Sequence, residues 1–327
     1  MLRSRVLSLA LVAAVSAACS PRVTSDAGAD GGADGGTDAA PPMIHGTFGV
    51  ELVRFELVRP QVSLVTAAVF DAEPPPLFRF DTTMRDGECE LLVPRIPFCA
   101  QRCPSNAVCV ADNTCQPRPN RVDVGAITVS GLRRNDMGPL SRFTTGAMGY
   151  QFESNELVYP PFAAGQTIQW SIAGAGTVPA MMVEMPAIDE MRVLSLTPES
   201  RPGQPLDVRW EPPAGAVPEG QRALVSLDFT HHAGLRGMIS CVTADDGAMT
   251  IPAGLITGLH ALGMAGFPAL FVTRSVLRTR EAAGHRMTFE VKSEKEIYVE
   301  IPGLRSCRSP QECPAGQRCR DDFTCGM

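Results

Sequence analysis

Apolar and polar residues alternate along most of this chain, which predicts β-strands that each bury one face. The alternation starts after Phe48 and recurs at Val62, Leu64 and Thr66, at Ile127 and Val129, and at Leu206, Val208 and Trp210. A period of two places alternate side chains on the same face of a strand. Clusters of Pro and Gly separate these runs, at 73–76, 159–161, 201–203 and 211–215. Short strands punctuated in this way predict β-sandwiches.

We therefore expect an all-β protein with two β-sandwich-like domains, at 43–190 and 191–302. A cysteine-rich insert at 89–119 interrupts the first domain, and a second small cysteine-rich module occupies 303–327. In the second domain the same alternation predicts further strands at 222–230, 237–243, 268–274, 286–292 and 297–301.

The segment 251–272 departs from the strand pattern because it has no charged residue over 22 positions. Two prolines, four glycines and a histidine interrupt it, which argues against a membrane span. A helical spacing relates three of its leucines, Leu255, Leu259 and Leu262. We expect one short buried helix that begins with Pro252 and stops at Gly263, followed by a core strand.

Residues 1–18 have the pattern of a signal peptide, with two arginines ahead of an apolar stretch that is too short to span a bilayer. Small residues at 16–18 then precede Cys19. This arrangement resembles the lipobox of bacterial lipoproteins, which implies that Cys19 receives a diacylglycerol and becomes the new N-terminus. Ser16 stands where that family usually has Leu, so cleavage after Ala18 by ordinary signal peptidase remains an alternative.

Residues 19–42 are expected to be the lipid anchor and a disordered tether. Asp recurs every four residues from Asp26 to Asp38, in a background of Gly and Ala. Such a segment has no side chains that could build a core, and its charges repel one another. A coil of this length spans roughly 25–30 Å. A calcium-binding Asp-Gly repeat would need an apolar position that this segment lacks.

The cysteine content indicates an oxidising compartment. Removing Cys19 from the eleven cysteines leaves ten, an even set that suits disulfide formation. Eight of the ten fall in two repeats of the spacing C-P-x4-C-x5-C, each with a fourth cysteine upstream: Cys99, Cys103, Cys109 and Cys115, and Cys307, Cys313, Cys319 and Cys325. Whether Cys89 and Cys241 pair with each other or stay reduced in a core remains open.

Each repeat of about 20 residues is too small to fold by apolar burial alone, so two disulfides of about 2–4 kcal/mol each are expected to order it. The spacing resembles Dickkopf N-terminal and EGF-like cysteine-rich repeats, which implies that the first cysteine pairs with the third and the second with the fourth. A zinc site would need paired C-x2-C knuckles or histidines, and the repeats have neither.

The tract from Leu206 to Gly215 resembles the second strand of a fibronectin type III or immunoglobulin-like module. Alternation places Leu206, Val208 and Trp210 inward and the charged residues between them outward. Trp170 lies in a similar alternating tract. Both tryptophans are therefore expected in cores rather than on a flat sugar-binding face.

Charge and motifs exclude some functions and leave others open. The formal net charge is −6, and the 29 basic residues are scattered, so no nucleic-acid partner is expected. The chain contains no G-x-S-x-G, H-E-x-x-H, phosphate-loop or dinucleotide-binding motif. We therefore assign no catalytic residue and expect no cofactor.

Among the five histidines only the adjacent pair His231 and His232 invites a metal hypothesis. In the strand expected there, neighbouring side chains point to opposite faces, so both cannot easily bind one ion. Asp228, Thr230 and His232 would share a face and form the best available constellation. A solvated polar strand face explains these residues equally well, so no metal site is assigned.

The anchor, tether, β-rich body and cysteine modules together resemble a class of predicted bacterial surface lipoproteins. The resemblance implies an exported protein, lipid-anchored at the outer membrane, that faces the periplasm or the cell surface. We expect a non-enzymatic role in adhesion, scaffolding or partner binding, with the membrane and an unknown envelope or surface protein as partners. An unrecognised secreted hydrolase or a metal-binding protein is the alternative.

Overall fold

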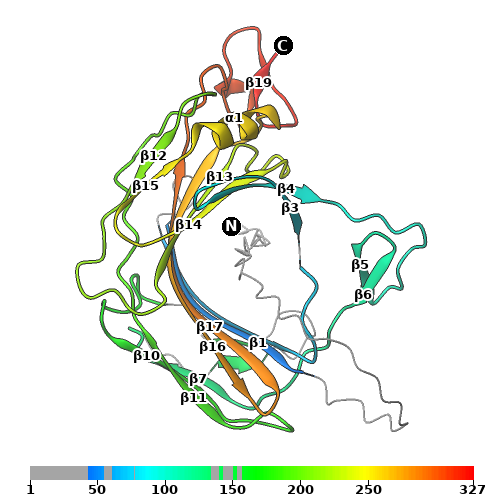
Figure 1. Ribbon diagram of the computed structural model, residues 1–327, viewed down its shortest axis with the longest axis vertical. Coiled ribbons are helices and arrows are strands. Elements are labelled where there is room, and N and C mark those ends of the chain that lie inside the picture. Colours follow the sequence, from blue (N-terminus) through cyan, green and yellow to red (C-terminus); the bar gives the residue numbers. More distant parts are fainter. Residues whose placement is uncertain (1–42, 55–60, 77, 134–139, 143–149, 153–156) are drawn as a thin grey trace, which may run out of the picture. The chain divides into compact units, whose positions relative to one another are not determined.

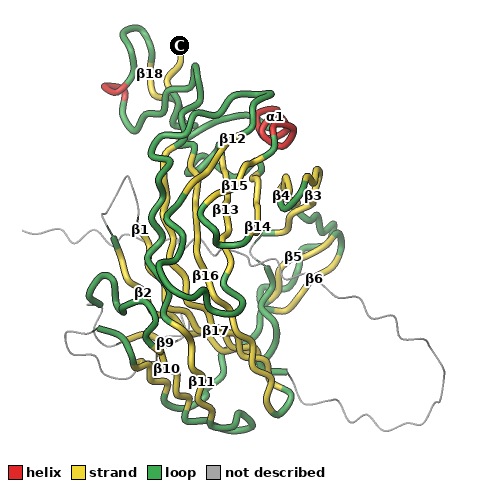
Figure 2. Tube along the Cα trace, turned by 60° about the vertical axis from the view of Figure 1, so that its left-hand side comes forward, coloured by secondary structure: helices red, strands yellow, loops and turns green. Residues whose placement is uncertain are grey.

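The computed structural model describes residues 43–54, 61–76, 78–133, 140–142, 150–152 and 157–327. The strands are β1 (His45–Arg54), β2 (Val62–Phe70), β3 (Arg79–Asp86), β4 (Cys89–Arg95), β5 (Ala107–Ala111), β6 (Thr114–Pro117), β7 (Ile127–Ser130), β8 (Leu140–Arg142), β9 (Tyr150–Phe152), β10 (Thr167–Ile172), β11 (Met181–Pro186), β12 (Leu206–Arg209), β13 (Arg222–Asp228), β14 (Met238–Thr243), β15 (Ala248–Ile251), β16 (Ala269–Ala282), β17 (His285–Tyr298), β18 (Arg318–Cys319) and β19 (Cys325–Gly326). The described part has one α-helix, α1 (Ala253–Ala261), and one 3-10 turn, Pro310–Glu312, both red in Figure 2. The all-β prediction is confirmed.

Thirteen strands form one sheet in the order β11-β10-β7-β8-β9-β2-β1-β17-β16-β13-β14-β4-β3 (Figure 1). At its centre lies the long hairpin of β16 and β17, whose strands pair in register from Ala269–Tyr298 to Ala282–His285. β1 joins this hairpin by pairing with β17 in parallel. β12 and β15 form a separate two-stranded sheet.

The first hydrophobic core lies between two parts of the large sheet. Phe48 of β1 stacks on Phe289 of β17 with ring centroids 4.7 Å apart. Trp170 of β10 meets Phe48 edge-on at 5.5 Å, although β10 is not a neighbour of β1 in the sheet. β10 and its neighbours therefore cover β1 and β17, which gives a sandwich-like arrangement with Trp170 buried, as the alternation predicts.

The second core lies where β12, β15 and α1 cover the sheet around β13, β14 and β16. Leu206, Val208 and Trp210 point into it, as predicted from their alternation. The helix prediction is also confirmed, because α1 starts directly after Pro252 and the chain turns at Gly263, whose positive φ of 96° suits glycine. Its leucines and Ile256 face the core, so the uncharged segment is internal.

Residues before about position 190 mostly belong to the first core, and residues after it mostly belong to the second. Each core also includes one segment from the other part of the sequence. Cys89 and Leu91 of β4 belong to the second core, although they precede residue 190 in sequence. Val276, on β16, and the first half of β17 belong to the first core. β17 then continues into the second core at Ile297. A single hairpin thus takes part in both cores.

Two strand predictions are wrong. The segments 286–292 and 297–301 were expected as separate strands, but β17 runs without a break from His285 to Tyr298. The polar residues 293–296 indicated a break, yet they pair in register with 271–274 of β16. On β2 the buried side chains are Val65, Ala67 and Val69, so the alternation was assigned to the wrong face. The odd-numbered and the even-numbered positions of β2 both carry small or apolar residues. The pattern therefore cannot show which face of the strand is buried.

Candidate functional site

Ten cysteines form five disulfides in the described residues, and Cys19 lies outside them. The pairs are Cys89–Cys241, Cys99–Cys109, Cys103–Cys115, Cys307–Cys319 and Cys313–Cys325. Each repeat has the one-to-three, two-to-four connectivity that the resemblance to Dickkopf and EGF-like repeats implies. Cys89 and Cys241 are direct partners on the neighbouring strands β4 and β14, and both are buried. We call 95–118 the first module and 305–327 the second module.

The second module packs against the body of the protein. Its Asp322 carbonyl accepts a hydrogen bond from Gly266 N at 2.7 Å, and the Ser306 hydroxyl donates to the Gly266 carbonyl at 2.5 Å. The Phe323 ring lies 6.1 Å from that of Phe267, over which Arg308 also stacks at 5.2 Å. These contacts bury the first cysteine of the module. The second module is therefore docked on the loop that follows α1.

The first module has the same connectivity but leaves apolar side chains in solvent. Ile96 is 90% exposed and Phe98 is 70% exposed. The backbone around Phe98 is nevertheless fixed, because its N–H donates to Asp112 Oδ1 at 3.1 Å and its carbonyl accepts from Asn113 N at 2.9 Å. This ordered, exposed apolar loop makes the first module the strongest candidate interaction site.

The geometry predicted around the histidine pair is wrong. β13 ends at Asp228, and the Asp228 carboxylate accepts hydrogen bonds from the backbone and hydroxyl of Thr230 at 2.7 and 2.9 Å. An Asp side chain that bonds the backbone two residues on turns the chain, so His231 and His232 do not continue the strand. His231 instead approaches Asp228 Oδ2 at 3.9 Å and Glu296 Oε1 at 3.6 Å, one carboxylate at each ring nitrogen.

The electrostatics of His231 favour a neutral ring. Burial, together with the neighbouring His232, lowers the pKa of His231 to about 4. Burial also raises the pKa of Asp228, against the opposing effect of its Thr230 hydrogen bonds. Among the described residues, two groups of three or more His, Cys, Asp or Glu side chains have ligand atoms close enough to share one metal ion. Each group consists of three cysteines of one module. Those sulfurs are in disulfides, so they offer no thiolate ligands.

A serine and a histidine also meet, although no sequence motif indicates the contact. Ser200 Oγ lies 3.1 Å from Nε2 of His260 on α1. Ser200 is only 1% exposed, and its N–H donates to the Glu300 carbonyl. In the described part of the chain no carboxylate contacts the other nitrogen of His260. The pair therefore has the base of a hydrolytic site but neither the orienting acid nor an accessible nucleophile.

A charged cluster lies on the face of β17 that points away from the first core. Lys292 Nζ is 3.2 Å from Glu51 Oε2 of β1, and Glu294 accepts a hydrogen bond from the Thr273 hydroxyl at 3.0 Å. Burial raises the pKa of Glu290 and Glu294. Burial opposes charge on Lys292 as well, but the surrounding carboxylates raise its pKa. The sequence signal for this cluster is the spacing of Glu290, Lys292 and Glu294, which places three charged side chains on one face of a strand.

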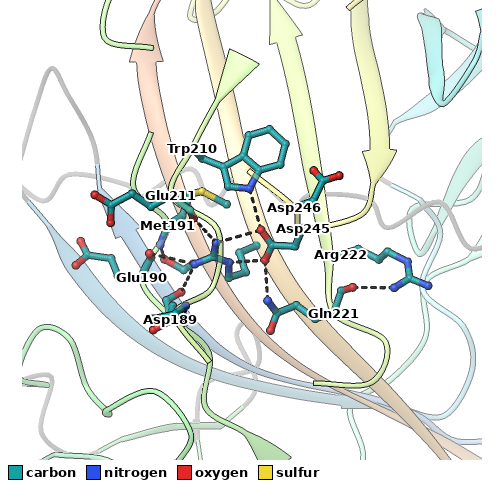
Figure 3. A network of polar contacts seen from close by, with 12 residues as sticks. Asp189, Glu190, Met191, Trp210, Glu211, Gln221, Arg222, Asp245 and Asp246 are labelled. Atoms are coloured by element: carbon teal, nitrogen blue, oxygen red, sulfur yellow. Dashed lines mark hydrogen bonds and ion pairs between the residues drawn. The ribbon is translucent and has the colours of Figure 1, made fainter. Parts of the chain in front are cut away.

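Figure 3 shows a second polar network, and the side chains at its centre are buried. Arg274 pairs with Asp245, which also accepts hydrogen bonds from Trp210 Nε1 at 2.8 Å and Gln221 Nε2 at 2.7 Å. Arg274 Nη2 donates to the Glu211 carbonyl at 2.7 Å. The network joins the segment around residue 190 to β16. Its enclosure and its use of backbone carbonyls indicate a structural role.

Comparisons with known proteins assign no family. No protein-family model matches the chain, and no curated protein matches it. Among solved structures it is similar to the chicken CNTN1 FN1–FN3 domains at 10% identity, with 75% of this chain and 70% of that chain covered. The TM-score of 0.19 is too low for this similarity to bear on the function. No helix among the described residues is long and apolar enough to cross a membrane.

Proposed function

We propose that this chain is an exported, non-enzymatic lipoprotein, anchored through Cys19 at an outer membrane, that binds at the cell envelope through its first module. The observation that carries the proposal is the ordered loop of the first module with Ile96 and Phe98 in solvent. Exposed apolar side chains that a rigid scaffold holds in place are typical of interaction sites.

Export is supported by the five disulfides, because such bonds persist in oxidising compartments. These bonds use ten of the eleven cysteines, and Cys19 is the remaining one. A lipid on Cys19 would account for the odd thiol, which would otherwise be free in an oxidising compartment. The Asp-rich segment after it would then act as the tether between lipid and body.

Metabolic labelling with an alkyne fatty acid tests the anchor. The wild-type chain expressed in a Gram-negative host should incorporate the label and fractionate with the outer membrane, whereas Cys19→Ala should incorporate none. An unlabelled wild-type protein whose N-terminus is an unmodified Cys19 would show cleavage by ordinary signal peptidase and would refute the anchor.

One observation favours the hydrolase alternative, namely the contact between Ser200 and His260. A fluorophosphonate probe reacts with activated serines and tests it directly. We expect no labelling of the purified protein, because Ser200 is buried. Labelling that disappears in Ser200→Ala but persists in Ser195→Ala would establish an activated serine and replace the proposal of a non-enzymatic protein.

A further inference from the structure

We propose that the apolar tip of the first module, formed by Phe78, Ile96 and Phe98, inserts into the interfacial layer of an anionic phospholipid bilayer. This inference rests on the proposed function, and it names a lipid surface as the target of the module. It adds a second, reversible membrane contact to the lipid on Cys19.

The β3–β4 hairpin places two of the three side chains together. Arg79 of β3 is the partner of Arg95 of β4, so Phe78, just before β3, and Ile96, just after β4, lie at the same end of the hairpin. Phe78 is 58% exposed, and its ring lies 6.3 Å from that of Phe80. The tip is therefore an exposed group of large apolar side chains rather than an isolated one.

The tip cannot easily collapse onto the protein. Pro97 lies between Ile96 and Phe98 and restricts the loop. The backbone hydrogen bonds of Phe98 to Asp112 and Asn113 and the adjacent Cys99–Cys109 disulfide fix the loop further. Little conformational entropy remains to be lost when such a loop binds, so the burial of its apolar surface contributes almost fully to the affinity.

Charge favours an anionic surface as the target. The first module contains three arginines and one acid, which gives it a charge of +2 in a chain of net charge −6. Arg95 pairs with two acids, Asp112 of the module at 3.1 Å and Asp81 of β3 at 3.9 Å. In the described part of the chain, neither Arg102 nor Arg118 forms an ion pair with an acid. Exposed aromatic and aliphatic side chains on a module that also carries arginines outside ion pairs are the combination that binds anionic headgroups and the layer beneath them.

Comparison of the two modules supports the assignment. Phe98 directly precedes the first cysteine of its module, and Ser306 directly precedes that of the second. Ser306 is turned to the body and donates to the Gly266 carbonyl, whereas Phe98 is turned to solvent. At this position the second module has a serine that contacts the body, whereas the first module has a large apolar side chain that is exposed.

Vesicle sedimentation tests the proposal with the Cys19→Ala chain, which carries no lipid. We expect this protein to bind vesicles of phosphatidylethanolamine and phosphatidylglycerol, more weakly at high salt and not to phosphatidylcholine alone. The double variant Ile96→Glu/Phe98→Glu should bind at least about tenfold more weakly. Arg102→Ser should weaken binding by about fivefold. Leu194→Glu/Leu196→Glu, at residues that are 56% and 71% exposed elsewhere, adds the same two charges, so it is the matched control and should bind normally.

Failure to bind anionic vesicles, or equal binding by the tip variant and the Leu194→Glu/Leu196→Glu control, would overturn the proposal. Loss of a defined protein complex in the tip variant, without vesicle binding by the parent protein, would identify the tip as a protein-binding site and would also overturn it. Intact mass before and after thiol alkylation verifies that all five disulfides remain in each variant. Because the test protein is never lipidated, its result is independent of the labelling experiment at Cys19.

Discussion

The guanidinium of Arg274 and the carboxylate of Asp245 form an ion pair from which solvent is almost excluded, with side chains 1% and 0% exposed. Arg274 comes from β16, in the long hairpin that takes part in both cores. Its remaining N–H groups donate to backbone carbonyls of Asp189, Glu190 and Glu211. The pair thereby fastens the segment that connects the two cores to the central hairpin.

Removing one partner of this pair should strongly destabilise the fold. Arg274→Met leaves the Asp245 carboxylate buried without its counter-charge, which typically costs about 3–5 kcal/mol. Urea unfolding followed by tryptophan fluorescence measures the loss. Arg192→Met breaks the exposed pair between Arg192 and Glu211 and should cost about 1 kcal/mol or less. Arg274→Met/Asp245→Leu should recover part of the loss, and a double variant less stable than Arg274→Met would contradict this account.

The buried disulfide between Cys89 and Cys241 should contribute more to global stability than those of the first module. It joins residues 152 apart in sequence and attaches β4 to β14 in the second core. We expect Cys89→Ala/Cys241→Ala to lower the free energy of unfolding by about 2–5 kcal/mol, with faster amide exchange in β3 and β4. The Cys99–Cys109 disulfide closes only a short exposed loop. Cys99→Ala/Cys109→Ala should therefore affect amide exchange in the first module only. Equal losses in both variants would show that the modules are coupled to the core.

Local patterns in this sequence predicted local structure well. The alternation at Leu206, Val208 and Trp210 identified a buried strand face, and the prolines and glycines around α1 identified its ends. The repeated cysteine spacing identified both modules. Each of these features depends on residues that are close in sequence, so a period or a spacing is enough to reveal it.

Relationships between distant residues could not be predicted in the same way. The parallel pairing of β1 with β17 joins segments about 240 residues apart, and no local pattern encodes it. The approach of Glu51 to Lys292 follows from that pairing, and the approach of Glu296 to His231 follows from the position of β16 between β17 and β13. The exposure of the first module could not be predicted either, because its cysteine spacing is the same as that of the docked module.

His231 should make the protein less stable in mildly acidic solution. Its pKa falls from 6.5 to about 4 on folding, so the unfolded chain binds more protons than the folded one between these values. The stability associated with the neutral ring is complete above about pH 6.5 and is lost as the pH falls towards 4, by about 2–3 kcal/mol. Urea unfolding of wild type and His231→Gln at several pH values measures this. The difference between the two proteins should change with pH in this window, and a constant difference would refute the shift.

The contact between Phe267 and Phe323 should determine whether the second module stays docked. Phe323 has a φ of 58°, an unfavourable backbone conformation for a bulky residue, whereas the first module has Asn113 with φ 57° at the equivalent position. The docked module thus tolerates a strained phenylalanine where asparagine fits better, and the ring contact with Phe267 offsets that strain. Phe267→Ala also removes the surface under Arg308, so residues 305–325 should exchange their amides at least about tenfold faster, while β13 and β16 remain protected. Phe98→Ala, in the first module, is the control and should leave that exchange unchanged. Wild-type exchange in Phe267→Ala would show that the backbone bonds of Gly266 hold the module without the rings.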